Sequence, residues 1–212
     1  MISLALDCST ALGGVVLAWG DDLNVLTREE FVAGRGRGGE LFRVLERAMH
    51  AVRASGDRLD EVVVGLGPGS YSGVRQVIAA AVGLAAATGA RLGGVPSVLA
   101  LRGVEGCYQT VGDARRGAFY YAAVREKTCV AGPELLPDSV ALQDRLAERS
   151  DWPVFVVDTA LPGGLLGDTP IATVDASALL AVPRAVHMPP PLEPIYLRPV
   201  SITLPKTGLA PP

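Results

Sequence analysis

A glycine-rich turn between a short β-branched run and a long apolar segment constrains the fold of this chain more than any other feature. Val62 to Val64 form the β-branched run, and glycines follow at positions 65, 67, 69 and 73. No further Gly or Pro then occurs before Gly83. This order predicts a strand, a turn and a helix from about Gly73 to Thr88.

The predicted helix is apolar on every side. Its polar side chains are confined to Arg75 and Gln76 near the start and Thr88 near the end. Such a helix must be covered all round, so one face can lie on a sheet while another needs a second helix or another chain. One wall consists of small residues that let a neighbouring backbone approach, namely Ala79, Ala80, Gly83, Ala86 and Ala87.

The turn can be compared with three motifs for nucleotides or nucleophiles, and each fails on spacing. A phosphate loop needs Lys followed by Ser or Thr, where this helix opens with Gly73, Val74 and Arg75. A dinucleotide turn needs a third glycine that is missing, and a nucleophile elbow needs Ser where Tyr71 stands. Two interpretations remain. Ser72 caps the helix, which we favour, or the first amides of the helix contact an anion.

Composition limits the class of protein. With 212 residues, 49% of them hydrophobic, the chain suits one large domain or two small lobes. A net charge of -3 offers no electrostatic basis for binding nucleic acid unaided. Cys8, Cys107 and Cys129 form no CxxC pair, which fits a reducing cytosol, and we expect neither a signal peptide nor a membrane span.

The first residues predict three strands. Ile2 to Asp7 reads as a buried strand that ends in an acid, followed by strands at Gly13 to Trp19 and Leu23 to Phe31, with a hairpin at 21–22. This opening resembles the actin and sugar-kinase superfamily, in which the acid and its turn approach phosphates and metal. No glycine follows Asp7, so we favour a structural role for this carboxylate.

The rest of the first half alternates helices and strands. We expect a loop at 33–39, an amphipathic helix at Glu40 to Arg53, a strand at Leu92 to Val95 and a short helix starting at Pro96. Gly103 to Gly106 reads as a boundary between lobes. The predicted division is therefore an N-terminal lobe at 1–105 and a smaller C-terminal lobe at 106–212.

The second half begins with two strands around a turn at Asp113 to Gly117. A short helix is expected at Leu142 to Arg149 and a strand at Val154 to Asp158, while Ala176 to Leu180 is too short to assign. The proline-rich tail reads as an extended segment that docks through Ile195 and Leu197 and frays past residue 205.

Five blocks resemble the TsaB (YeaZ) family, which is related to the threonylcarbamoyl-transfer protein TsaD. They are Leu4 to Asp7, GPGSYSGVR at 67–75, GVPSVLAL at 94–101, DARRGAFYYA at 113–122 and EPIYLR at 193–198. The resemblance implies an α/β fold of two actin-like (ASKHA, RNase H-like) lobes with mixed sheets flanked by helices. It also implies a cytoplasmic role in making N6-threonylcarbamoyladenosine at tRNA position 37.

Family members are regarded as non-catalytic scaffolds, so the resemblance implies specific partners. These are a TsaD-like protein, a TsaE-like ATPase through the complex, tRNA only indirectly, and a second copy when the chain is isolated. The helices at 40–53 and 73–88 would form the contact. The expected interface residues are Leu41, Leu45, Ala48, Tyr71, Val74, Val77, Ala80, Ala81, Leu84 and Ala87.

A rival interpretation is a small kinase or ATPase that uses Asp7, Thr10 and Asp113 around ATP or ADP and Mg²⁺. His50 and His187 are the only histidines, so the paired metal ligands of TsaD have no equivalent, and no metal site is expected. For the same reason the name glycopeptidase, used for relatives, finds no chemistry here. Two departures from the family pattern are Arg37 to Gly39 in place of a His-Ser pair, and a second lobe that looks about 20 residues short.

Overall fold

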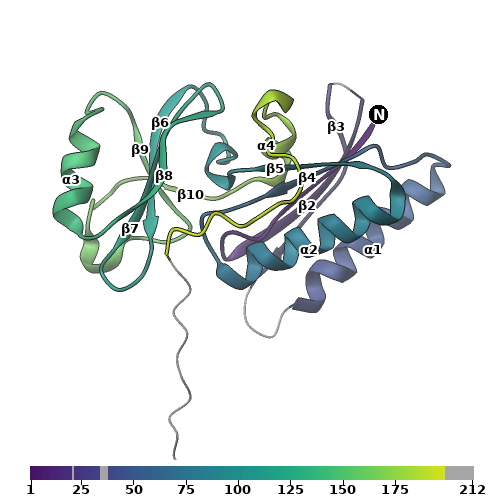
Figure 1. Cartoon of the computed structure of the whole chain (residues 1–212), viewed down its shortest axis with the longest axis horizontal. Coiled ribbons are helices and arrows are strands. Elements are labelled where there is room, and N and C mark those ends of the chain that lie inside the picture. The colour runs from purple at the N-terminus through teal and green to yellow at the C-terminus, as the bar shows by residue number, and fades with distance from the viewer. Residues whose placement is uncertain (21, 34–37, 199–212) are drawn as a thin grey trace, which may run out of the picture.

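The structure is a computed structural model that describes residues 1–20, 22–33 and 38–198. The hairpin position 21, most of the loop at 33–39 with Arg37, and the tail beyond 198 lie outside the described residues. Two five-stranded sheets stand side by side, each with helices against it (Figure 1). In the part described, no helix is long and apolar enough to cross a membrane.

The first sheet has the order β3-β2-β1-β4-β5. Its strands are β1 (Ile2–Asp7), β2 (Leu12–Trp19), β3 (Asn24–Val32), β4 (Glu61–Gly65) and β5 (Arg91–Val95). The first three strands are antiparallel neighbours, whereas β4 and β5 run parallel to β1. The mixed sheet and the strand–turn–helix unit are therefore as predicted.

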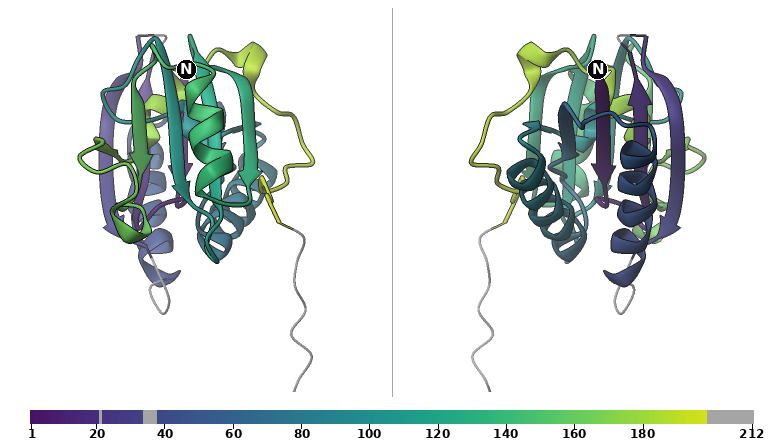
Figure 2. Two further views of the ribbon diagram at one scale, coloured as in Figure 1. Left: turned by 90° about the vertical axis from the view of Figure 1, so that its left-hand side faces the viewer. Right: turned by 90° about the vertical axis from the view of Figure 1, so that its right-hand side faces the viewer.

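Helices cover both faces of this sheet. On one face α1 (Gly38–Ala54) and α2 (Tyr71–Thr88) enclose a core that includes Leu4, Leu6 and Val64. On the other face lie the short helix α4 (Ala176–Leu180) and the 3-10 turn η1 (Ser97–Leu99). Figure 2, right, shows α1 and α2 in front of the strands, with no described helix or strand in front of them.

The second sheet repeats this arrangement in the order β10-β9-β6-β7-β8. Its strands are β6 (Cys107–Asp113), β7 (Phe119–Arg125), β8 (Thr128–Leu136), β9 (Val154–Val157) and β10 (Ile171–Ala172). Three antiparallel strands are followed by α3 (Ser139–Ala147) and two parallel strands, as in the first sheet. However, a 3-10 turn, η2 (Pro162–Gly164), joins β9 to β10 where the first sheet has α2. The second lobe thus lacks a counterpart of the longest helix.

The chain returns to the first sheet before it ends. The helix α4 packs on β1, β2 and β4, and Met188 exchanges backbone hydrogen bonds with Gly94 on β5. Ile195 then donates its N–H to the carbonyl of Leu66. Position 105 lies between the two sheets, whereas α4, Met188 and Ile195 lie against the first sheet. Arg198, the last described residue, donates a hydrogen bond to the carbonyl of Arg115 in the turn between β6 and β7.

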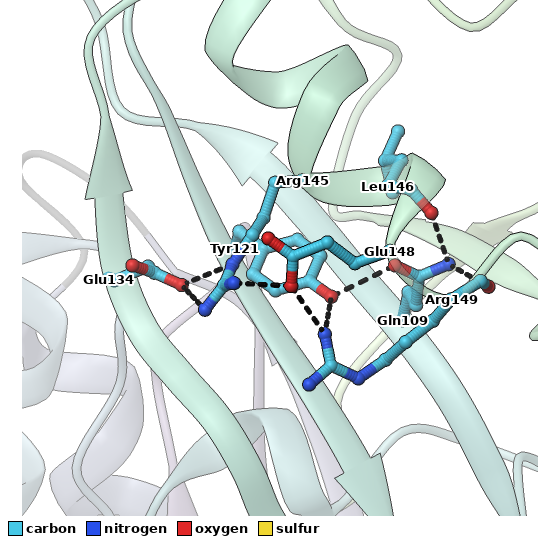
Figure 3. Close-up of polar contacts among 7 residues, drawn as sticks. All are labelled: Gln109, Tyr121, Glu134, Arg145, Leu146, Glu148 and Arg149. Carbon is cyan, nitrogen blue, oxygen red and sulfur yellow. Dashed lines mark hydrogen bonds and ion pairs between the residues drawn. The ribbon is translucent and has the colours of Figure 1, made fainter.

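A buried amide ties α3 to the second sheet (Figure 3). The Gln109 side chain accepts a hydrogen bond from the Tyr121 hydroxyl at 2.9 Å and donates to the carbonyls of Arg149 at 2.9 Å and Leu146 at 3.4 Å. Outside this amide, Arg145 pairs with Glu134 and Glu148. Because Gln109 is 1% exposed, water does not reach the amide group that these three partners contact.

We predict that Gln109→Met lowers the free energy of unfolding by about 2 kcal/mol, since the Tyr121 hydroxyl loses its acceptor and two carbonyls each lose one of their donors while the volume is nearly kept. The urea midpoint measures the change. Gln143→Met on the exposed side of α3 is the matched control and should leave the midpoint unchanged. Equal midpoints for both variants would contradict the role of the amide.

Candidate functional site

The glycine turn before α2 lies against the backbone of the turn that follows β1. A Cβ at Gly69 would lie 2.1 Å from the carbonyl oxygen of Ser9, and a Cβ at Gly73 would lie 2.1 Å from that of Cys8. Ser70 donates its N–H to the same Ser9 carbonyl at 2.7 Å. The two glycines are thus required by a contact within the chain, so they need no bound phosphate to account for them.

The first turn of α2 is capped from within. Ser70 is the N-cap, and its hydroxyl accepts a hydrogen bond from the N–H of Gly73 at 3.2 Å. The prediction that Ser72 caps this helix is wrong, because the helix begins two residues earlier and Ser72 lies exposed within its first turn. Two serines at this spacing before an apolar run cannot be told apart from sequence.

Asp7 is a structural residue in the core. Its side chain is 2% exposed and accepts hydrogen bonds from Ser9 N and Ser9 Oγ, both at 2.7 Å, and from Ser97 Oγ at 2.5 Å. Burial raises the pKa of this carboxyl above its ordinary value of 3.8. The adjacent Gly65 has no room for a Cβ, which would lie 1.8 Å from Asp7 Oδ2. Asp7 therefore links the end of β1 to η1, and it lies against Gly65 at the end of β4.

A cleft of about 650 Å³ separates the two sheets near this turn. Thr10 and Asp113, two residues of the rival nucleotide site, line this cleft, whereas Asp7 does not. Thr10 donates its hydroxyl to the carbonyl of Leu12 at 2.9 Å, and Asp113 pairs with Arg115 at 3.1 Å. The structure adds Asp158, which accepts from the N–H of Ala11 and gives no signal in the sequence.

The charges of the cleft are poorly matched to a polyphosphate. Arg115 is the one cation among its described lining residues, and Asp113 and Asp158 are both anions. In the described ranges, no three His, Cys, Asp or Glu side chains are grouped in a way that could hold a metal ion. A nucleotide would therefore meet two carboxylates and one arginine, which is itself paired with Asp113.

A second candidate site is the outer surface of α1 and α2. Phe42 is 56% exposed and Val82 is 45% exposed, and the small residues Ala79, Gly83 and Ala86 are exposed beside them. Between the two helices runs a groove of about 420 Å³. We call the exposed residues Ala79, Val82, Gly83, Ala86 and Ala87 the α2 strip.

The structure shows where the ten expected interface residues lie. Six of them are buried by this chain itself and support the helices from beneath, namely Leu41, Leu45, Ala48, Val74, Val77 and Ala81. Tyr71 and Ala87 are exposed, whereas Ala80 and Leu84 are partly exposed in the groove. Val82 was not among the ten, because the periodicity of a helix that is apolar all round does not show which side meets the sheet. Phe42, on the amphipathic helix α1, was not among them either.

Comparisons with known proteins place the fold. A family model described as TsaD, tRNA N6-adenosine threonylcarbamoyltransferase, matches residues 32–148. An uncharacterized protein of Mycobacterium leprae is 32% identical over 93% of this chain, which spans 55% of that relative's length. An uncharacterized protein of Mycobacterium tuberculosis is 30% identical over 92% of this chain and 90% of its own length.

Two solved structures from Pseudomonas aeruginosa share the fold. The chain described as an uncharacterized protein with similarity to peptidase YeaZ superposes with a TM-score of 0.69 at 22% identity, covering 93% of this chain and 99% of its own. YeaZ itself superposes with a TM-score of 0.68 at 21% identity over 92% of this chain and 99% of its own. The predicted α/β fold with two actin-like lobes is confirmed.

We predict that Asp7→Asn is at least as stable as the wild type at neutral pH. A folded-state pKa raised by burial means that the contribution of Asp7 to stability is fully present below pH 3.8 and is lost as the pH rises through the folded value. Asparagine removes this titration and can still bond Ser9 and Ser97.

Urea unfolding between about pH 4 and pH 8 tests this prediction. The decline of stability with pH should be smaller in Asp7→Asn than in the wild type. Asp7→Ala is the contrast variant, and it should lose about 2 kcal/mol because the N–H and hydroxyl of Ser9 and the hydroxyl of Ser97 lose the oxygen to which they donate. An asparagine variant as unstable as the alanine variant would show that the charge itself is required.

Proposed function

Because the chain belongs to the TsaD family of tRNA N6-adenosine threonylcarbamoyltransferases and has the fold of YeaZ, we propose that it is a non-catalytic partner subunit in the synthesis of N6-threonylcarbamoyladenosine in tRNA. Its partner is a TsaD-like transferase in the cytoplasm. A TsaE-like ATPase and tRNA join through that partner, and a second copy occupies the same surface when the chain is alone.

The observation that carries the proposal is the exposed apolar surface of α1 and α2. Phe42 and Val82 lie more than two-fifths exposed on neighbouring helices, and the α2 side of the groove between these helices is lined mainly by the small residues Ala79, Ala80 and Gly83. Large apolar side chains exposed together over a small-residue wall are typical of a surface that another protein covers. Such a wall lets two helices pack closely.

The site between the lobes supports a role without catalysis. The glycine turn before α2 packs directly against the backbone of the turn after β1. Asp7 is hydrogen-bonded to Ser9 and Ser97 and does not line the cleft. We therefore propose that the chain needs no cofactor or metal of its own. The second lobe also favours a role without catalysis, because its described residues have the short turn η2 between β9 and β10 in place of a helix that matches α2.

The alternative is a nucleotide-dependent ATPase or kinase of the same fold. The observation in its favour is the cleft of about 650 Å³ with Thr10 and Asp113 at its wall. Calorimetric titration of the isolated chain with ATP and MgCl₂ separates the two. Saturable binding with turnover would favour the enzyme, and no heat of binding would favour the partner subunit.

We predict that Val82→Glu abolishes pairing with the TsaD-like protein while the chain stays folded. The side chain is already exposed, so the free chain tolerates the charge, but a packed contact would bury an unpaired carboxylate at a cost of several kcal/mol. Co-purification and size-exclusion chromatography measure the pairing.

Val140→Glu on α3 is the matched control, because Val140 is 65% exposed on the other lobe. This variant should pair as the wild type does. Equal pairing by Val82→Glu and Val140→Glu would contradict the proposed surface, and failure of the wild type to bind any TsaD-like protein would contradict the proposed function.

A further inference from the structure

Two tyrosines and an arginine stand at the N-terminal end of the α2 strip. Tyr71 is 51% exposed and Tyr196 is 45% exposed, and their ring centres lie 5.5 Å apart. Arg75 Nη1 donates a hydrogen bond to the Tyr71 hydroxyl at 2.7 Å, and its guanidinium carbon lies 5.2 Å from the centre of the Tyr71 ring. The three residues come from α2 and from the returning tail, so the fold alone brings them together.

Arg75 differs from most other arginines of this chain in its partners. Arg47, Arg102, Arg145 and Arg184 each pair with a carboxylate. Among the described residues, no carboxylate lies within ion-pair distance of Arg75, which is held by Tyr71 instead. A guanidinium held in one orientation has lost part of its rotamer freedom in advance, which lowers the entropy cost of binding an anion.

This cation is continuous with the α2 strip. Tyr71, Arg75, Ala79, Val82 and Ala86 are all exposed and follow each other at intervals of four, four, three and four residues, which places them along one side of the helix. A partner that covers the strip must therefore also cover Arg75 or end beside it.

An apolar hollow adjoins the cation. It measures about 240 Å³, and its mostly apolar wall includes Pro68, Val74, Ile195 and Leu197 together with Tyr71 and Tyr196. One carboxylate, Asp113, and one further cation, Arg198, also line it. Exposed Tyr and Arg beside an apolar hollow is the composition that carries most binding energy at protein interfaces. The hollow is large enough for one apolar side chain of a partner, while an acidic residue beside that side chain contacts Arg75.

We propose that Arg75, positioned by Tyr71 and flanked by Tyr196, binds a carboxylate of the TsaD-like partner next to an apolar side chain that enters the hollow. This inference rests on the proposed function. It adds that an arginine–carboxylate contact at the N-terminal end of the α2 strip selects the partner. The charge complementarity favours an acidic segment of a different protein, since a planar guanidinium binds a carboxylate through two parallel hydrogen bonds.

Isothermal titration of the purified TsaD-like protein into this chain tests the proposal at about 0.05 and 0.5 M salt. Arg75→Gln should weaken binding about tenfold and Arg75→Glu about 100-fold, and the salt dependence of the wild type should shrink in both. Tyr71→Phe keeps the charge but removes the positioning hydroxyl, and it should weaken binding about threefold.

Arg125→Gln is the charge-matched control, because Arg125 is exposed on β7 of the other lobe and also lacks a carboxylate among the described residues. It should bind as the wild type does. Thermal unfolding of each variant should match the wild type, since Arg75 is exposed.

Binding by Arg75→Gln within about twofold of the wild type would overturn the inference and leave the proposed function standing. Weakened self-association in sedimentation equilibrium, with unchanged affinity for the TsaD-like protein, would identify a second copy as the occupant and also overturn it. Absence of binding by the wild type would instead overturn the proposed function, on which the inference rests.

Discussion

The contact between the turn after β1 and the glycine turn before α2 determines how the rest of the molecule is arranged. The carbonyl oxygens of Cys8 and Ser9 occupy the space that side chains at positions 73 and 69 would need. This contact fixes the N-terminal end of α2 against the end of β1. It also leaves no free backbone amide of Ser70 for a phosphate, because that N–H is bonded to Ser9. This contact therefore disfavours phosphate binding at the turn. It also sets the direction of α2, the helix that carries the surface proposed to bind a partner.

The direction of α2 decides which of its residues are available to a partner. Val74, Val77 and Ala81 face the sheet, so the opposite side of an almost wholly apolar helix remains outside. The second lobe has the same strand order but no counterpart of this helix. The two lobes thus share a strand order but differ in the element that carries the exposed strip, since η2 stands between β9 and β10 where α2 stands between β4 and β5.

Much of the fold could be predicted from local pattern, and the misses have physical causes. The β-branched run before Gly65 and the long segment up to Thr88 indicate their own structures, because the signals lie within a few residues. β8 was missed, since Gly132 and Pro133 interrupt its pattern and an edge strand tolerates both. The contact of Ser9 with Gly69 spans 60 residues, and no periodicity reports it. The outward face of α2 was equally hidden, so the exposure of Val82 required the structure.

Hydrogen–deuterium exchange of this chain, alone and with the TsaD-like protein, tests the central claim most directly, because it locates the covered surface without any substitution. We expect slower exchange in the amides of α1 and α2, with β6 to β10 and α3 unchanged. Protection confined to the second lobe, or to the cleft between the sheets, would show that the apolar surface of α1 and α2 is not where the partner binds.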